Sequence, residues 1–78
     1  MNEEPIIPFP IRCYSKQELA LSYFPETSNP HTAVNHLMAW IKRCKPLWAK
    51  LVEQGYEKHA KWFNSKEVRL IVEYLGEP

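Results

Sequence analysis

The chain has 78 residues, of which 45% are hydrophobic and 24% are charged, and its formal net charge is +1. A chain of this length has room for one small domain, so a two-domain enzyme is excluded. The near-neutral charge predicts no general attraction to nucleic acid or to an anionic membrane. Any such partner must therefore be recognised by a local feature.

The first ten residues are rich in proline. Prolines at positions 5, 8 and 10 exclude a helix there, so we expect residues 1–10 to form an extended arm and residues 11–78 to form a single domain. The chain begins with acidic residues, unlike the basic start of a secretory leader, and no apolar run reaches the roughly 18 residues of a membrane span. We therefore expect a cytoplasmic protein without a membrane segment.

A short strand followed by a helix is predicted at the start of the domain. Residues 11–14 alternate in polarity and include good strand formers. Ser15 and Glu18 then have the spacing of a capping box, in which the two side chains satisfy each other's backbone amides. The sequence thus predicts a helix that begins at Ser15 and ends before Pro25.

The longest predicted helix follows a polar turn over residues 25–29. Asn29 and Pro30 are typical of an N-cap and a first helical position, so we expect a helix from Pro30 to about Arg43. Its predicted core stripe consists of Ala33, Val34, Leu37, Trp40, Ile41 and Cys44. Its opposite face carries His31, Thr32, Asn35, His36, Ala39, Lys42 and Arg43. This outer face contains no acidic residue.

A third helix and a second strand are predicted next. Residues 46–54 supply an apolar face that begins at a helix-breaking Lys-Pro pair and ends at Gly55. A turn then leads to a short strand at residues 61–63. This strand can pair with residues 11–14.

The last predicted helix begins with Asn64 and Glu67 in capping-box spacing and ends at Gly76. Together the elements predict a mainly helical α+β domain, winged-helix-like, in which four short helices with a helix-turn-helix core accompany a small two-stranded β element. The predicted core consists of Leu19, Phe24, Leu37, Trp40, Ile41, Leu51, Phe63, Val68 and Ile71.

No combination of residues points to catalysis or to metal binding. The chain contains no Asp, and its two glycines lie at predicted helix ends, which excludes a glycine-rich phosphate loop. His31 and His36 are five residues apart, whereas ligand pairs on a helix need a spacing of about three or four. Cys13 and Cys44 lack C-x-x-C spacing, so we expect reduced thiols in the core. We expect no enzyme, cofactor, metal site or small-molecule substrate.

The outer face of the 30–43 helix is the strongest candidate for a functional surface. It offers short donors and acceptors for base edges and cations for phosphates. The candidate DNA-binding residues are Thr32, Asn35, His36, Lys42, Arg43 and Lys45. The sequence favours a reader of double-stranded DNA that acts as a homodimer or with a partner, because one helix neutralises few phosphates. A plain solvated helix is the alternative, although such a face usually includes Glu.

A second functional hypothesis is a non-enzymatic adaptor or inhibitor that binds another protein. Trp62 is expected to point away from the core if Phe63 points inward, because successive strand residues face opposite sides. An outward Trp is typical of a protein interface. In this alternative the protein docks through residues 56–62, with Tyr56 and Trp62 as contacts, and through the N-terminal arm.

Two segments resemble a known family. Residues 14–20 (YSKQELA) and residues 68–78 (VRLIVEYLGEP), with Ala33 through Ile41 and the Gly55–Tyr56 pair between them, are similar to an uncharacterised family of small Bacteroides-type bacterial proteins, a domain of unknown function. The resemblance covers about residues 11–78. It implies a bacterial cytoplasmic protein and assigns no activity.

The order of the elements also resembles the winged helix-turn-helix of the MerR and excisionase type. In that plan the second helix enters the major groove and a later hairpin forms a wing. The resemblance implies that Lys58 and Lys61 lie on the wing. It further implies a transcriptional or mobile-element accessory factor.

Overall fold

The computed structural model describes residues 9–78, so residues 1–8, which make up most of the predicted arm, lie outside the described residues. The elements follow in the order β1 (Tyr14–Ser15), α1 (Lys16–Tyr23), α2 (Pro30–Arg43), α3 (Lys45–Glu53), β2 (Trp62–Phe63) and α4 (Ser65–Leu75). The protein is a mainly helical globule with a small two-stranded antiparallel sheet. This confirms the predicted fold class.

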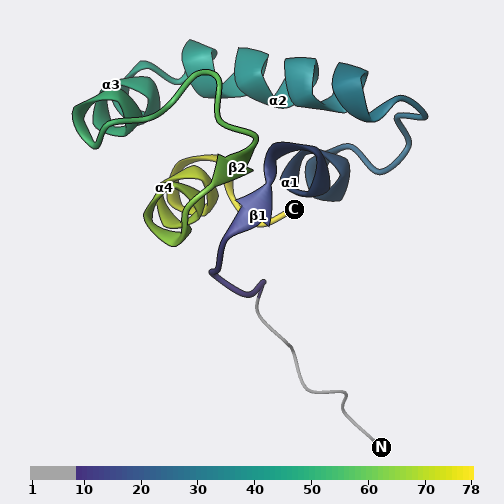
Figure 1. The fold of residues 1–78 in the computed structure, drawn as a ribbon, viewed down its shortest axis with the longest axis horizontal. Coiled ribbons are helices and arrows are strands. Elements are labelled where there is room, and N and C mark those ends of the chain that lie inside the picture. The colour runs from purple at the N-terminus through teal and green to yellow at the C-terminus, as the bar shows by residue number, and fades with distance from the viewer. Residues whose placement is uncertain (1–8) are drawn as a thin grey trace, which may run out of the picture.

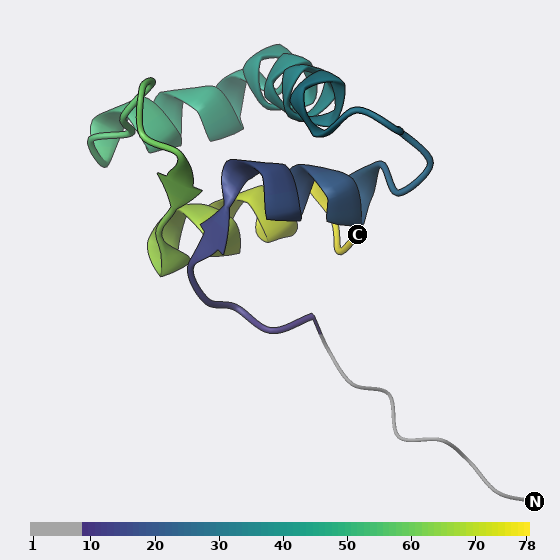
Figure 2. The ribbon, with the colours of Figure 1, turned by 45° about the vertical axis from the view of Figure 1, so that its right-hand side comes forward.

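The helices are arranged in two layers. Helices α2 and α3 form one layer, and α1, α4 and the sheet form the other (Figures 1 and 2). Packing runs round a ring: α1 contacts α2, α2 contacts α3, α3 contacts α4, and the sheet closes the ring between α4 and α1. Helix α1 is seen nearly end-on in Figure 1, where α2 lies across the view, so these two helices cross steeply. The outer side of α2 is left uncovered.

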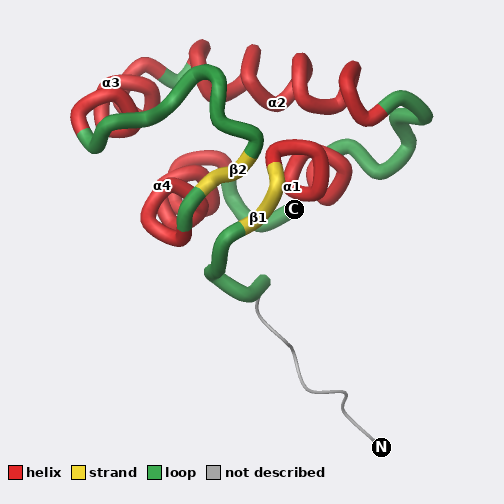
Figure 3. The backbone as a smooth tube through the Cα atoms, in the orientation of Figure 1, coloured by secondary structure: helices red, strands yellow, loops and turns green. Residues whose placement is uncertain are grey.

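The sheet is shorter than the sequence predicts and joins distant parts of the chain (Figure 3). Strands β1 and β2 are antiparallel, with Tyr14 opposite Phe63 and Ser15 opposite Trp62. The strand expected over residues 11–14 is therefore shorter and shifted to Tyr14–Ser15, and the one expected over residues 61–63 is shortened to Trp62–Phe63. Since β2 pairs with β1, the segment after α3 returns as a single strand of this sheet.

The start of α1 contains half of its predicted capping box. The Ser15 hydroxyl accepts a hydrogen bond from the Glu18 amide at 3.0 Å, so the predicted N-cap is confirmed. The Glu18 carboxylate, expected to return to Ser15, instead accepts a hydrogen bond from Arg12 at 3.3 Å. The reciprocal half does not form, and Arg12 offers the Glu18 carboxylate a charged partner instead.

The other helix boundaries follow the sequence closely. Asn29 caps α2, with Pro30 as its first residue, and Asn64 and Glu67 form a complete capping box at α4. Gly55 and Gly76 have positive φ values of 87° and 88°, which a glycine adopts without the steric strain of a Cβ. The predicted helix-ending role of both glycines is confirmed.

The core lies between the two layers, and seven of the nine expected core residues are fully buried there. They are Leu19, Leu37, Ile41, Leu51, Phe63, Val68 and Ile71. Two expectations are wrong. Trp40 is 43% exposed, because it lies at the edge of the apolar stripe, where it contacts the ring of Phe24 edge-on at 4.8 Å. Phe24, the C-cap of α1, is half-buried and its ring contacts those of Trp40 and His36.

The two cysteines also differ from the expectation that both lie in the core. Both are free thiols; Cys44 is half-buried and Cys13 is exposed. Cys13 immediately precedes Tyr14, whose side chain is buried. Since neighbouring residues of an extended chain point to opposite sides, an inward Tyr14 turns Cys13 outward.

Candidate functional site

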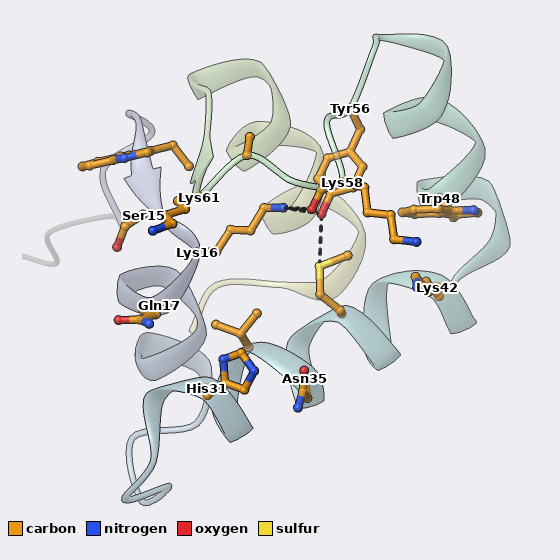
Figure 4. A pocket seen from close by; sticks show the side chains of 14 residues that line it. Ser15, Lys16, Gln17, His31, Asn35, Lys42, Trp48, Tyr56, Lys58 and Lys61 are labelled. Carbon is orange, nitrogen blue, oxygen red and sulfur yellow. Dashed lines mark hydrogen bonds between the residues drawn. The ribbon is translucent and has the colours of Figure 1, made fainter.

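A cavity of about 730 Å³ opens between α2, the start of α1 and the α3–β2 loop, which comprises residues 54–61 (Figure 4). The start of α1 contributes Ser15, Lys16 and Gln17. Helix α2 contributes His31, Val34, Asn35, Met38 and Lys42. The remaining wall consists of Trp48, Tyr56, Lys58, Ala60, Lys61 and Trp62. We call this space the α2–loop cavity.

Lys16 holds the loop in place at the floor of the cavity. Its ammonium group donates hydrogen bonds to the Tyr56 hydroxyl at 2.7 Å and to the carbonyls of Glu57 and Lys58 at 3.3 and 3.2 Å. Its backbone amide donates to the Lys61 carbonyl at 2.8 Å. One residue at the start of α1 therefore fixes both ends of the segment that carries Lys58 and Lys61.

Burial changes the acid–base properties of Lys16 and Tyr56. Loss of solvent lowers the pKa of Lys16, while the carboxylates of Glu67 and Glu57 partly oppose this change. Loss of solvent also raises the pKa of Tyr56, and the negative charge of Glu67 acts in the same direction. A raised pKa keeps the Tyr56 phenol protonated at neutral pH, and its oxygen accepts the hydrogen bond from Lys16.

Soft and aromatic groups line the deep side of the cavity. The Tyr56 hydroxyl lies 3.5 Å from the Met38 sulfur, and the Tyr56 ring meets the Trp48 ring edge-on at a centroid distance of 5.6 Å. The Lys42 ammonium lies 5.6 Å from the centre of the Trp48 ring. The cavity therefore offers an apolar, polarisable wall with a cation over one of its aromatic faces.

The cavity is electropositive. Its lining includes four lysines, at positions 16, 42, 58 and 61, and His31, and it includes no Glu. The nearest influential carboxylates, Glu57 and Glu67, are those that act on Lys16. Because Lys16 already donates to three oxygens, the lysines able to meet a ligand are the other three.

The structure brings together half of the predicted DNA-binding residues. Asn35, Lys42, Lys58 and Lys61 line the α2–loop cavity, although the first two lie on α2 and the others on the loop. The other four are exposed but lie outside the cavity: Thr32, His36 and Arg43 on α2, and Lys45 as the first residue of α3. The predicted residues thus divide between the cavity, other exposed positions of α2 and the start of α3.

The predicted protein-interface residues have different environments. Trp62 is 57% exposed while its neighbour Phe63 is fully buried, so the predicted outward direction of Trp62 is confirmed. Tyr56 is half-buried, and its hydroxyl and ring contact Lys16, Met38 and Trp48. The contacts of Tyr56 therefore lie mainly inside the cavity and not on the outer surface.

Sequence reasoning missed Lys16, Met38 and Trp48. Met38 lies on neither predicted face of the 30–43 helix, and Trp48 belongs to the apolar face predicted for residues 46–54. Lys16 had one detectable signal, because a cation in the first turn of a helix is disfavoured by the helix dipole and needs another partner. That partner, the loop 40 residues further along the chain, is not visible in the sequence.

Two further features of the described residues concern metals and membranes. Within residues 9–78, no group of three or more His, Cys or Glu side chains is placed to hold a metal ion. In the same part of the chain, none of the helices has the length and apolar character that crossing a bilayer requires.

Comparison with known proteins identifies a family without a known activity. No curated protein and no solved structure matches the chain. The model of one family, described as Domain of unknown function (DUF4248), matches residues 10–78. This range includes every helix and strand of the structure and the whole α2–loop cavity. The chain therefore belongs to the DUF4248 family of domains of unknown function.

Proposed function

We propose that the protein binds double-stranded DNA, with the outer face of α2 in the major groove. One observation carries the proposal: α2 crosses α1 steeply and leaves an acid-free outer side open along its whole length (Figures 1 and 2). A steep crossing of two consecutive helices, with the second free to enter the groove, is typical of helix-turn-helix readers.

The exposed residues of α2 suit separate parts of a duplex. Thr32, Asn35 and His36 offer hydroxyl, amide and imidazole groups for base edges. Lys42 and Arg43 lie in the last turn of α2, where they can meet phosphates. Lys58 and Lys61, held beside α2 by Lys16, add cations at the flank of the same helix.

The net charge of +1 limits how much DNA one molecule can neutralise. Useful affinity then requires two copies on paired half-sites or a protein partner on the DNA. Such binding fits a transcriptional or mobile-element accessory factor.

Binding to random duplex across a salt series tests the proposal. Replacing either Lys42 or Arg43 with Ala should reduce the slope of log affinity against log salt by about 0.9, because each variant loses one phosphate contact. Lys66→Ala and Arg69→Ala are matched controls, since both side chains are exposed on α4 in the other layer and should leave the slope unchanged.

A duplex selected from a random library tests base reading. Asn35→Ala should reduce the preference for the selected duplex over random duplex and keep the salt slope. A folded protein that binds no duplex at low salt contradicts the proposal, as does an equal loss of slope in the α4 controls.

A further inference from the structure

We propose that the α2–loop cavity binds a mononucleotide, a ligand that combines a flat ring system with a phosphate group. The cavity shares Asn35, Lys42, Lys58 and Lys61 with the proposed DNA-binding surface, but binding of a free mononucleotide is measured without duplex, so either proposal can fail while the other holds. A volume of about 730 Å³ is within the range of small-molecule sites. A mononucleotide can enter such a concave space, whereas a stacked base pair cannot.

The phosphate would lie beside Lys42 and Lys58, which Figure 4 shows at the same end of the cavity, whereas Lys61 lies at the opposite end. Within residues 9–78, the ammonium groups of these three lysines make no hydrogen bond or ion pair with another side chain. Lys58 lies on a segment whose backbone is held by Lys16, so its backbone position is set before a ligand arrives. A fixed backbone lowers the entropic cost of bringing its lysine to an anion.

The ring system would lie against the wall formed by Trp48, Tyr56 and Met38. Trp48 is half-buried, and its ring is covered by the Lys42 ammonium at 5.6 Å, which is a replaceable contact. A base that stacks on Trp48 would take over this position and leave Lys42 available to the phosphate. Figure 4 shows Lys58 extending toward the same end of the cavity.

The assignment rests on the end of the cavity where Trp48, Lys42 and Lys58 lie together (Figure 4). A stacking surface with two cations beside it offers partners for the ring and for the phosphate of a mononucleotide. Asn35 and Gln17 line other parts of the cavity and are not needed for this assignment.

Titration of the full chain with adenosine 5′-monophosphate, followed by NMR, tests the inference. Signals of Trp48, Tyr56 and Met38 should shift and saturate, and the affinity should be at least about tenfold higher than for adenosine or for inorganic phosphate alone. Equal affinity for inorganic phosphate, shifts confined to α4, or no saturable shift at millimolar nucleotide would overturn it.

Variants separate the cavity from general attraction by charge. Lys42→Ala should weaken binding of the monophosphate about tenfold, a loss typical of one charge-assisted hydrogen bond. Lys45→Ala and Arg43→Ala should leave it unchanged, because both side chains are exposed nearby but lie outside the cavity. Trp48→Leu should bring the affinity down to that of inorganic phosphate. Equal losses of affinity in Lys42→Ala and Lys45→Ala would show that binding depends only on net charge, and this result would overturn the proposed site.

Discussion

The first turns of α1 and α4 have the same sequence pattern but form different contacts. Each begins with a polar N-cap, Ser15 or Asn64, and each has a Glu three residues later. At α4 both halves of the box form: Glu67 accepts from the Asn64 amide at 2.9 Å, and Asn64 accepts from the Glu67 amide at 2.8 Å. At α1 only the Ser15 half forms, and the Glu18 carboxylate contacts Arg12.

The difference also appears in the two buried charges of the described residues, one in each turn. Glu67 is 5% exposed, and its carboxylate closes a contact between residues three apart. Lys16 is 8% exposed, and its ammonium reaches Tyr56, 40 residues away. The hydrogen bond of the buried charge at the start of α4 is therefore local, whereas Lys16 at the start of α1 contacts the distant α3–β2 loop.

The largest effect is expected at β2, the strand that connects the two starts. Phe63 is fully buried and its ring stacks on Tyr56 at a centroid distance of 6.1 Å. Phe63→Ala should reduce the free energy of unfolding by about 3 to 5 kcal/mol, enough to unfold a domain of this size. Urea unfolding followed by circular dichroism measures it. Trp62→Ala, at the exposed neighbour, should change it by about 0.5 kcal/mol, and equal losses would contradict the burial of Phe63.

The next effect is expected at Lys16. Lys16→Met keeps the apolar stem and removes the ammonium, so the Tyr56 hydroxyl and two carbonyls lose their donor. We expect a loss of about 1 to 3 kcal/mol and faster hydrogen exchange at the amides of the α3–β2 loop.

Lys66→Met is the matched control for this variant. Lys66 is exposed in the first turn of α4, where a cation opposes the helix dipole, so its loss should be neutral or slightly stabilising. If both variants behave alike, Lys16 does not hold the loop.

A smaller effect should distinguish the two capping glutamates. Glu67→Ala should reduce the free energy of unfolding by about 1 to 2 kcal/mol, because it breaks a complete capping box at a buried position. Glu18→Ala removes only a half-exposed ion pair with Arg12 and should cost about 0.5 kcal/mol or less. Chemical denaturation of the two variants gives the comparison. Glu67→Gln should recover most of the loss, since an amide oxygen can accept the same bond; no recovery would assign the effect to charge.

The smallest effect concerns the far ends of the same two helices. Tyr23, the last residue of α1, donates a hydrogen bond to the Gly76 carbonyl after α4. Burial, with a contribution from Glu77, raises the pKa of Tyr23 from 10.0 to about 12. The folded state then retains the phenol proton where the unfolded state has lost it, so this stabilisation is complete below pH 10 and disappears as the pH rises to about 12.

Tyr23→Phe tests this dependence. The variant should be less stable than the wild type by about 1 kcal/mol at pH 7, through the lost hydrogen bond. The difference should shrink as the pH rises from 10 to 12, as measured by urea midpoints. Tyr74→Phe, on the exposed side of α4, is the control and should follow the wild type. A constant difference up to pH 12 would contradict the raised pKa of Tyr23.

Features that depend on neighbours in the sequence were predicted well. The bounds of α2, the caps at Ser15, Asn29 and Asn64, and the ends of the helices at the two glycines follow from contacts within a few residues. The burial of Leu37 and Ile41 follows from the helical period. The same period wrongly predicted that Trp40 is buried, because the width of a buried stripe depends on which helix covers it.

The candidate site was predicted only in part. Asn35, Lys42, Lys58 and Lys61 were selected for their chemistry, and the fold places them round one cavity. The placement of Lys58 and Lys61 beside α2 depends on Lys16, whose partners are about 40 residues away. Pattern and spacing describe faces of single elements, so they contain no information on which two faces will enclose a space.

The sequence by itself determined the helices, their caps and most of the inward-facing residues of this protein, because helix formation and capping are satisfied by backbone and side chains a few positions apart. Only the tertiary structure decided that the Glu18 box stays open, that Lys16 is buried against the α3–β2 loop, and that a cationic cavity forms beside α2. These outcomes depend on competition between partners that meet only after the two layers pack.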